Sequence, residues 1–307
     1  MKPRIVFLVG PTAIGKTNIA ITLAKKINAE IVSCDSMQVY KGMDILTSKP
    51  SMAFKKTISH HLISIVSADK EYNVSRYYKD VSAKIKEIIR RGKVPFIVGG
   101  TGLYMSILID GIFKSRPASK ATRSRLYGEA GEKGGEYLYR KLKDIDPSAA
   151  LKIHPHDTKR IVRALEVYEA TGKPITSLQR QRHGLKDKYD IKVFCLSMER
   201  DKLYQKIDKR VDRMFAQGAA SEVKKLLRLK LSRTARYALG IREAKGYLDG
   251  LYGLEEAKRL LKKNTRNYAK RQLTWFRKDK RIIWLDIKDK EKPVSIAKRI
   301  FENLNIK

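Results

Sequence analysis

The chain has 307 residues, of which 42% are hydrophobic and 32% are charged. This length and composition indicate a soluble, folded protein with a substantial core, and they exclude a peptide-like binding module and a largely disordered chain. The 67 Lys and Arg residues outnumber the 32 Asp and Glu residues, which gives a formal net charge of +35. Such a charge predicts a polyanionic partner, either nucleic acid or an anionic membrane, unless it reflects a lysine-rich bias of the source proteome.

Cysteine content and hydropathy indicate the compartment. The two cysteines, Cys34 and Cys195, are too few for a disulfide framework, and no Cys-x-x-Cys motif indicates a zinc site. The apolar run Ile5 to Val9 is too short for the core of a signal peptide, and no segment approaches the roughly 20 apolar residues of a membrane-spanning helix. We therefore expect a cytoplasmic protein in a reducing environment, with no membrane partner.

Short apolar runs alternate with amphipathic helical patterns. The runs predict buried parallel strands at Arg4–Val9, Glu30–Cys34, Val94–Val98, Ile191–Leu196 and Ile282–Asp286. Apolar residues recur at helical spacing from Ile19 to Ile27 and over Val74–Arg91. Strand, helix and strand in alternation predict an α/β fold with a doubly wound parallel sheet.

The middle of the chain has a different pattern. From Ser115 to about Tyr189 the strand pattern is absent, and Lys, Arg, Tyr and helix-forming residues dominate. A second helical region extends from Glu199 to about Arg277. We predict a catalytic core made of residues 1–114 and 190–307, with C-terminal helices, and a helical insertion made of residues 115–189.

The segment Gly10 to Thr17 reads GPTAIGKT and fits the G-x-x-x-x-G-K-[ST] phosphate-binding loop (P-loop). It follows an apolar strand and precedes an amphipathic helix, as this motif requires. The glycines let backbone N–H groups point toward an anion, Lys16 adds a positive charge, and Thr17 supplies a hydroxyl for Mg²⁺. The sequence therefore predicts bound phosphate, because a merely structural turn would leave Lys16 unexplained.

Polar residues and glycines follow two further strands. Asp35 follows the second strand, and the segment VGGTGLY brings Gly99, Gly100 and Thr101 to the same edge of the sheet, where open α/β folds bind ligands. From the residues alone, Asp35 is a magnesium ligand, a general base or a cap. The glycines allow either close approach of a ligand or a plain turn.

Several accessory motifs are missing. No strand ends in the Asp-Glu pair of ATP-driven motors, and no NKxD motif indicates a GTPase. The neighbouring histidines at 60 and 61 are expected to be structural, because no third ligand lies at metal-binding spacing. The P-loop alone thus leaves the phosphate compound open.

Six blocks of the sequence resemble the tRNA dimethylallyltransferases, also called tRNA isopentenyltransferases. Between Arg4 and about Arg277 they read, in order, GPTAIGKT, DSMQVYKGMDILTSKP, HHLI, VGGTGLY, IHPHDTKRIVRALEVYEATGKP and YAKRQLTWFR. The resemblance implies transfer of a dimethylallyl group from dimethylallyl diphosphate to N6 of the adenosine 3′ of the tRNA anticodon, with Mg²⁺. It also implies that the insertion grips the anticodon arm, and we expect the chain to act as a monomer.

The resemblance further implies residue roles. It assigns catalysis to Asp35 as general base, to Thr101 beside the flipped base and to Lys16. It assigns the diphosphate to Gly10, Pro11, Thr12, Ala13, Ile14, Gly15, Lys16 and Thr17, with Arg210 or Arg213, and the metal to Thr17. It assigns tRNA contacts to Asp35, Ser36, Met37, Gln38, Thr101, Arg123, Lys159, Arg160, Ile161, Val162 and Arg163.

The chain departs from the family pattern at two positions. His156 stands where the family usually has Asn in its HPND block, and Ile241 replaces an aromatic residue in the GY[KR]E block. Neither change removes a group that the chemistry needs, but the local RNA contacts at these two positions do not follow from the family pattern.

The implied chemistry agrees with the residue types. Donors aimed at the leaving diphosphate would stabilise its new charge, and Asp35 would accept the proton that the adenine amine sheds. A base in a single-stranded loop is easily unstacked, and Tyr268 or Trp275 either stacks on it or belongs to the core. The alternatives are prenylation of a free adenine nucleotide, an ATP-dependent small-molecule kinase and a non-enzymatic RNA-binding protein.

Overall fold

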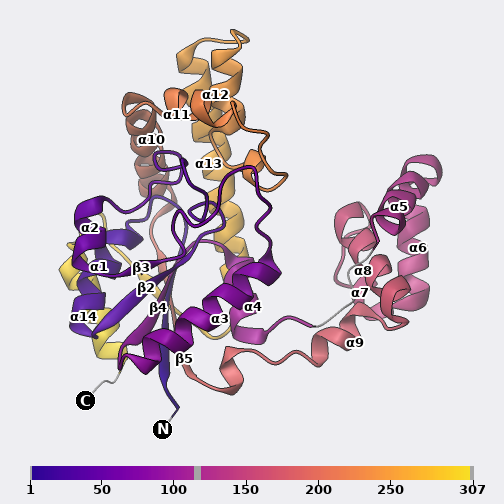
Figure 1. Ribbon diagram of the computed structural model, residues 1–307, viewed down its shortest axis with the longest axis horizontal. Coiled ribbons are helices and arrows are strands. Elements are labelled where there is room, and N and C mark those ends of the chain that lie inside the picture. The colour runs from indigo at the N-terminus through magenta and orange to yellow at the C-terminus, as the bar shows by residue number, and fades with distance from the viewer. Residues whose placement is uncertain (1, 114–118, 305–307) are drawn as a thin grey trace. The chain divides into compact units, whose positions relative to one another are not determined.

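The computed structural model describes residues 2–113 and 119–304 (Figure 1). The chain divides into a core unit, residues 1–109 and 188–307, and a helical unit, residues 110–187. The boundary predicted between residues 114 and 115 lies outside the described residues. The return to the core unit falls between residues 187 and 188, two residues before the predicted position.

The core unit contains a parallel sheet of six strands in the order β3-β2-β4-β1-β5-β6. The strands are β1 (Arg4–Val9), β2 (Ala29–Cys34), β3 (His60–His61), β4 (Val94–Gly99), β5 (Asp190–Ser197) and β6 (Ile282–Asp286). The five predicted strands are confirmed. Strand β3 was not predicted, because a pair of residues is too short to show a strand pattern.

The register aligns the carboxyl ends of the central strands. Val9 of β1 pairs with Gly99 of β4 and with Cys195 of β5, and Cys34 of β2 also pairs with Gly99. The segments that follow these strands therefore leave the sheet at one edge. This is the edge at which parallel α/β sheets bind ligands.

Helices cover both faces of the sheet, which confirms the doubly wound α/β fold. On one face, α1 (Lys16–Lys26) and α14 (Pro293–Asn303) lie side by side (Figure 1) and share a core with Val6 and Leu8. Side chains alternate along a strand, so Ile5, Phe7 and Val9, which are also buried, face the opposite side. That side carries α3 (Val74–Arg90) and α4 (Gly102–Asp110), whose Tyr77 and Tyr104 rings stack.

The other helices of the core unit follow β2 and β5. The short α2 (Met52–Thr57) precedes β3. After β5 come α10 (Arg200–Ala216), α11 (Ala219–Leu226), the 3₁₀ turn η2 (Ala235–Tyr237), α12 (Ile241–Leu248) and α13 (Leu254–Phe276). Helix α13 packs on both α10 and α12, and α11 packs on α12. These helices confirm the helical region predicted between β5 and β6.

The helical unit contains α5 (Lys120–Lys133), α6 (Gly135–Ile145), α7 (Pro147–Ala150), α8 (Thr158–Thr171), α9 (Ile175–Arg180) and the 3₁₀ turn η1 (Leu185–Asp187). Helices α5, α6 and α8 pack around Leu126, Leu138, Leu142 and Leu165. This unit has its own apolar core and no strand among its described residues. Within residues 2–113 and 119–304, no helix is long and apolar enough to cross a bilayer.

Candidate active site

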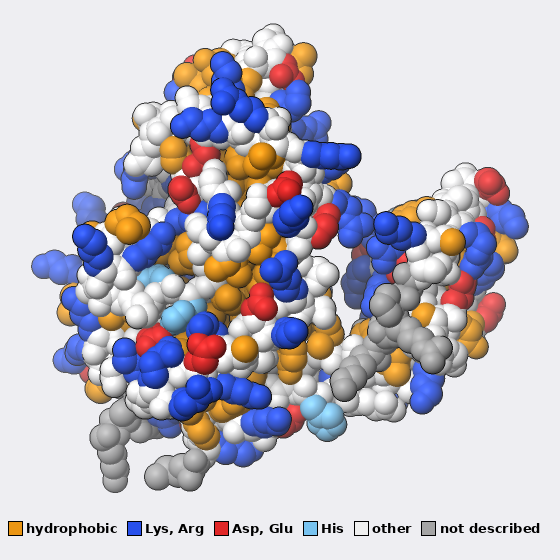
Figure 2. Space-filling view, viewed as in Figure 1, with side chains coloured by type: hydrophobic (Ala, Val, Ile, Leu, Met, Phe, Trp, Pro, Cys, Tyr) orange, Lys and Arg blue, Asp and Glu red, His pale blue; other side chains and the backbone are white. Residues whose placement is uncertain are grey.

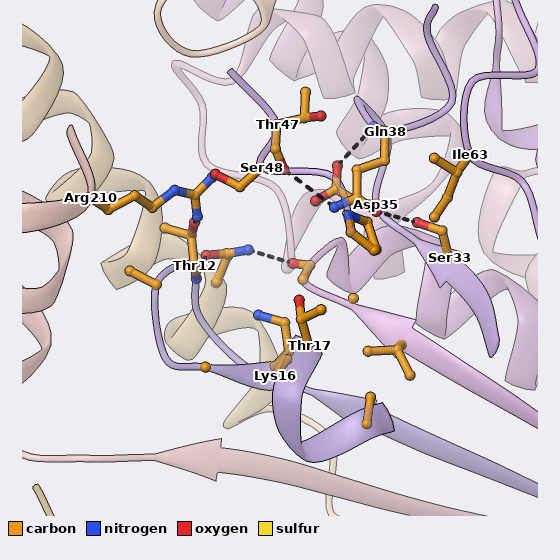
Figure 3. A pocket seen from close by; sticks show the side chains of 18 of the residues that line it. Thr12, Lys16, Thr17, Ser33, Asp35, Gln38, Thr47, Ser48, Ile63 and Arg210 are labelled. Atoms are coloured by element: carbon orange, nitrogen blue, oxygen red, sulfur yellow. Dashed lines mark hydrogen bonds between the residues drawn. The ribbon is translucent and has the colours of Figure 1, made fainter. Parts of the chain in front are cut away.

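The P-loop connects β1 to α1 at the carboxyl edge of the sheet. Ala13 and Gly15 both have positive φ values, +65° and +99°, so the backbone curls between them. A side chain at position 15 would be strained at that φ, which explains the glycine. The Lys16 ammonium donates to the carbonyl oxygens of Gly10 at 2.8 Å and Pro11 at 2.7 Å and so lies over the loop (Figure 3).

A cavity of about 440 Å³ opens above the loop. Figure 3 shows Lys16 and Thr17 at its base, with Thr12 and Arg210 on one side and Asp35 on the other. Helix α10 adds several cations to its wall, namely Lys206, Lys209, Arg210 and Arg213. The lining is therefore rich in positive charge, which suits a phosphate compound.

A second cavity of about 230 Å³ shares part of this wall. Both cavities are lined by Thr12, Asp35, Thr47, Arg210 and Tyr268. The rest of the second lining is mainly apolar and comprises Ser36, Met37, Leu46, Val211, Met214, Tyr237, Ala238, Leu239, Leu261, Thr265 and Arg271. Asp35 thus lies where a cationic cavity and a mainly apolar cavity meet.

Burial reduces the hydration of the two cations nearest the loop. It lowers the pKa of Lys16 to about 8, although the Asp35 carboxylate opposes the shift. Burial also lowers the pKa of Arg210, again against the influence of Asp35. Poorly hydrated cations are stabilised by an anion, so the site is prepared for a negatively charged ligand.

The two candidate arginines lie differently. Arg210 donates from Nη1 to the Thr12 hydroxyl and is partly buried, whereas Arg213 is exposed at the wall of the larger cavity. Val211 and Met214, which follow these two arginines directly on α10, are buried and line the smaller cavity. The structure therefore brings Arg210, rather than Arg213, into contact with the P-loop.

Asp35 and Thr101 are brought together by β2 and β4. Asp35 Oδ1 accepts hydrogen bonds from the Met37 amide at 2.9 Å and the Gln38 amide at 3.4 Å. The Thr101 hydroxyl accepts from the Ser36 amide at 3.1 Å, while the Thr101 amide donates to the Cys34 carbonyl at 3.0 Å. Asp35 therefore caps the turn after β2 and also lines both cavities.

Gly99 ends β4 and Gly100 follows it, and both line the larger cavity. A Cβ at Gly99 would lie 2.1 Å from the Cys34 carbonyl oxygen, and one at Gly100 would lie 2.2 Å from Gln272 Nε2. Their small size therefore allows β2 and α13 to pack closely against this segment, while close approach of a ligand from the cavity stays a prediction.

Gln272 is a site residue that the sequence analysis missed. Its side-chain oxygen accepts from the Thr12 amide at 2.9 Å, and its Nε2 donates to the Gly100 carbonyl at 2.8 Å. The sequence did contain a sign of this role, because Gln272 is a polar residue at helical spacing from Ala269 and Phe276 on the buried face of α13. A buried amide at such a position requires partners, and here the partners are the P-loop and the segment after β4.

A second missed residue holds the segment between Asp44 and Leu46. Glu222 of α11 accepts hydrogen bonds from the amides of Asp44, Ile45 and Leu46 at 2.8, 2.8 and 2.9 Å. The next residue, Thr47, lines both cavities, and its carbonyl accepts from Gln38 Nε2 at 3.3 Å. Glu222 was not predicted, because no local sequence pattern indicates that a glutamate binds amides almost 180 positions away.

The histidine pair belongs to the sheet edge. His61 Nε2 lies 2.6 Å from Glu30 Oε2, and Arg91 also donates to this carboxylate. Burial favours the neutral acid, but hydrogen bonds from Arg91 and His61 lower the pKa of Glu30 to about 2. His60 lines the larger cavity, and no cluster of three potential metal-ligating residues occurs in the described part of the chain.

The remaining candidate residues lie in the helical unit. Lys159, Arg160 and Arg163 of α8 are exposed, whereas the side chains of Ile161 and Val162 are buried in the core of the unit. Their side chains pack with α5 and α6, so within residues 159–163, which were expected to contact tRNA, only the three cations present their side chains at the surface.

Arg123 is engaged within the same unit. It donates to the fully buried Glu166 from Nε and, at 2.8 Å, from Nη2, and Arg163 approaches the same carboxylate at 3.6 Å. Arg123 therefore neutralises a buried acid, although its side chain remains 41% exposed.

The two other aromatic candidates lie on α13. Tyr268 lines both cavities, and burial and the nearby Asp35 raise its pKa. Trp275 lies outside both linings and is 44% exposed; it donates to the Ser106 hydroxyl at 3.2 Å and packs over Gly102. The sequence treated the two rings alike, but the structure places only Tyr268 in the site.

The chain is similar to known proteins over its whole length. Residues 38–279 match the family model described as IPP transferase. The tRNA dimethylallyltransferase of Alkaliphilus oremlandii is 45% identical over 99% of this chain and 97% of its own length. That of Carboxydothermus hydrogenoformans is 46% identical over 100% and 99%.

Solved structures agree with the sequence relatives. The full-length tRNA isopentenylpyrophosphate transferase from Bacillus halodurans aligns with a TM-score of 0.71 at 39% identity and covers 99% of this chain and 97% of its own. A eukaryotic dimethylallyltransferase acting on tRNA aligns with a TM-score of 0.82 at 30% identity, over 97% of this chain and 77% of its own. The P-loop, the two cavities and the position of Asp35 between them agree with these similarities. This chain therefore belongs to the IPP transferase family, and its relatives named above are tRNA dimethylallyltransferases.

Proposed function

We propose that this chain transfers a dimethylallyl group from dimethylallyl diphosphate to N6 of the adenosine 3′ of the anticodon in tRNA and releases diphosphate. The relatives named above are tRNA dimethylallyltransferases by name, which gives the transferred group and the class of acceptor. The single observation that carries the proposal is the position of Asp35, where the cationic cavity over the P-loop meets the mainly apolar cavity. Such a pair of cavities provides one site for a diphosphate and another for a base.

The larger cavity would bind the donor through its diphosphate. The curled backbone from Gly10 to Gly15 offers N–H groups at the start of α1, and Lys16 and Arg210 add two poorly hydrated positive charges. When the bond between the allylic carbon and the diphosphate oxygen breaks, negative charge grows on that oxygen. Groups already aimed at the phosphates stabilise this charge without reorganising, which lowers the barrier.

Mg²⁺ fits the donor set at this site. The Thr17 hydroxyl lies in the cavity wall on the first turn of α1, and protein-bound Mg²⁺ takes few protein ligands together with phosphate oxygens and water. Thr17 would hold the ion, which when bound supplies positive charge to the diphosphate.

Asp35 would act as the general base. Attack forms the bond between adenine N6 and the allylic carbon while the carbon–oxygen bond to diphosphate breaks, and the N6 proton passes to the Asp35 carboxylate. Two amides fix Oδ1 of this carboxylate, so its orientation is set before the substrate binds. The Thr101 hydroxyl, held by the Ser36 amide, would lie beside the base.

The smaller cavity would receive the target adenine. Its apolar side chains suit an unstacked ring, and Tyr268 in the shared wall adds an aromatic face. The exposed Lys159, Arg160 and Arg163 of the helical unit would contact RNA phosphates. The net charge of +35 supports a polyanionic substrate, and we infer that the chain acts as a monomer in the cytoplasm.

Incubation of the purified protein with Mg²⁺, dimethylallyl diphosphate and unmodified tRNA tests the proposal. We expect mass analysis of the tRNA nucleosides to find a dimethylallyl group on the adenosine 3′ of the anticodon. Unmodified nucleosides would refute the proposal. Consumption of ATP in place of the prenyl donor would instead indicate a kinase, and efficient modification of AMP would indicate a nucleotide prenyltransferase.

A further inference from the structure

Tyr237 is an exposed aromatic residue at a cavity. It ends the 3₁₀ turn η2 and lines the smaller cavity, yet 73% of it is exposed. Ala235 in the same turn and Ala238 directly after it are buried, with exposed fractions of 0% and 5%. The backbone is thus packed into the core unit while the ring extends outward beside the opening of the cavity.

Hydrogen bonds hold the backbone around Tyr237 in place. The Ser232 amide donates to the Ala68 carbonyl at 2.9 Å. Glu71 accepts from the Arg233 amide at 2.8 Å and from the Thr234 hydroxyl at 2.9 Å. An exposed ring on such a fixed backbone is preorganised for a flat partner, because little backbone entropy is lost when the partner binds.

The surface leading to Tyr237 is basic. From the end of α11 to η2 the chain carries Lys224, Lys225, Arg228, Lys230, Arg233 and Arg236. All six are exposed, and none forms an ion pair with an acidic residue in the described part of the chain. The acid nearest to these residues in the sequence, Glu222 of α11, is engaged by the amides of Asp44, Ile45 and Leu46. Figure 2 shows Lys and Arg side chains gathered over the upper part of the core unit, where Figure 1 places α11 and α12.

We propose that Tyr237 is a stacking platform for the nucleobase that adjoins the target adenosine in the RNA. This proposal rests on the proposed function, because it places the target base in the smaller cavity. A base on the exposed ring of Tyr237 would leave its phosphates over the unpaired cations of the 224–236 segment. Aromatic stacking together with nearby positive charge is typical of proteins that bind single-stranded nucleic acids.

The closing experiment uses an anticodon stem–loop RNA with the fluorescent base 2-aminopurine beside the target adenosine. We expect wild-type protein and Tyr237→Phe to quench its fluorescence on binding, because stacking quenches this base. Tyr237→Ala should not quench it and should bind the RNA about 10-fold more weakly, the order expected for loss of one base stack. Leu251→Ala is the control, because Leu251 is 74% exposed and lines neither cavity.

The outcomes separate the two proposals. Equal quenching by wild type and Tyr237→Ala, at unchanged RNA affinity, overturns the stacking role even if wild type modifies the RNA. If wild type quenches the fluorescence through Tyr237 but transfers no prenyl group, the stacking role stands and the proposed function fails. A wild-type protein that binds no RNA overturns both. Thermal melting of each variant and its affinity for diphosphate report whether the fold and the P-loop are intact.

Discussion

The side chain of Gln272 on α13 accepts a hydrogen bond from the backbone amide of Thr12 in the P-loop, 260 residues earlier in the chain, at 2.9 Å. Its other end donates to the Gly100 carbonyl after β4. The P-loop is thus attached to the last long helix of the core unit as well as to β1 and α1. The shape of the site therefore depends on α13, which also carries Tyr268.

We expect Gln272→Leu to weaken this attachment. The substitution leaves the partly buried Thr12 amide and the buried Gly100 carbonyl without their partner, which costs about 1–3 kcal/mol of unfolding free energy. Urea denaturation measures this loss, and the affinity for dimethylallyl diphosphate should fall with it. Thr274→Ala, at an exposed position of the same helix, is the control. Unchanged stability and donor affinity in Gln272→Leu would contradict a positioning role.

Diphosphate binding should depend on pH through Lys16. Because burial lowers the pKa of Lys16 to about 8, the free protein loses this charge as the pH rises through 8, whereas the complex requires it. The affinity should therefore change little below pH 7 and fall by up to about 10-fold for each pH unit above 8. Calorimetric titration with diphosphate between pH 6.5 and about 9.5 measures this dependence of the affinity on pH. In Lys16→Arg the cation keeps its proton throughout, so a fall of equal size in that variant would argue against Lys16 as its source.

Arg210 and Arg213 should differ in their effect on turnover. Arg210 donates to Thr12 beside the P-loop, so Arg210→Ala should lower kcat by about 10²–10³-fold, the range for removal of one preorganised donor to a developing anion. Arg213→Ala removes an exposed charge at the cavity wall and should chiefly raise the KM for the donor. Steady-state kinetics with varied donor concentration separates the two effects. Equal losses of kcat in both variants would show that contact with Thr12 does not distinguish them.

Asp35→Asn should remove the general base but keep the turn after β2 that Asp35 caps. The amide oxygen of Asn can still accept from the Met37 amide, so we expect a normal melting temperature and nearly unchanged RNA affinity. Turnover should fall about 10²–10⁴-fold, the range for loss of a general base. Single-turnover prenyl transfer with saturating RNA measures this directly. A variant with full turnover would leave Asp35 only its role as a cap.

The sequence by itself determined the parallel sheet, the P-loop and the family. These features depend on local patterns, namely apolar runs, helical periodicity and short motifs, which residues close in the chain carry among themselves. The five longer strands were therefore predictable, and the two-residue strand β3 was not. The motifs also placed Asp35 and Thr101 at one edge, because the carboxyl ends of parallel strands meet there.

Only the tertiary structure decided which residues meet across long separations. It brought Arg210, rather than Arg213, into contact with Thr12, packed Cys34 and Gln272 against Gly99 and Gly100, and joined Gln272 to Thr12. In the helical unit it buried Ile161 and Val162 on the inner face of α8, although they lie between exposed cations in the sequence. The physical reason is that burial and hydrogen-bond partners depend on how helices pack on the sheet and on one another, and no short stretch of sequence contains that information.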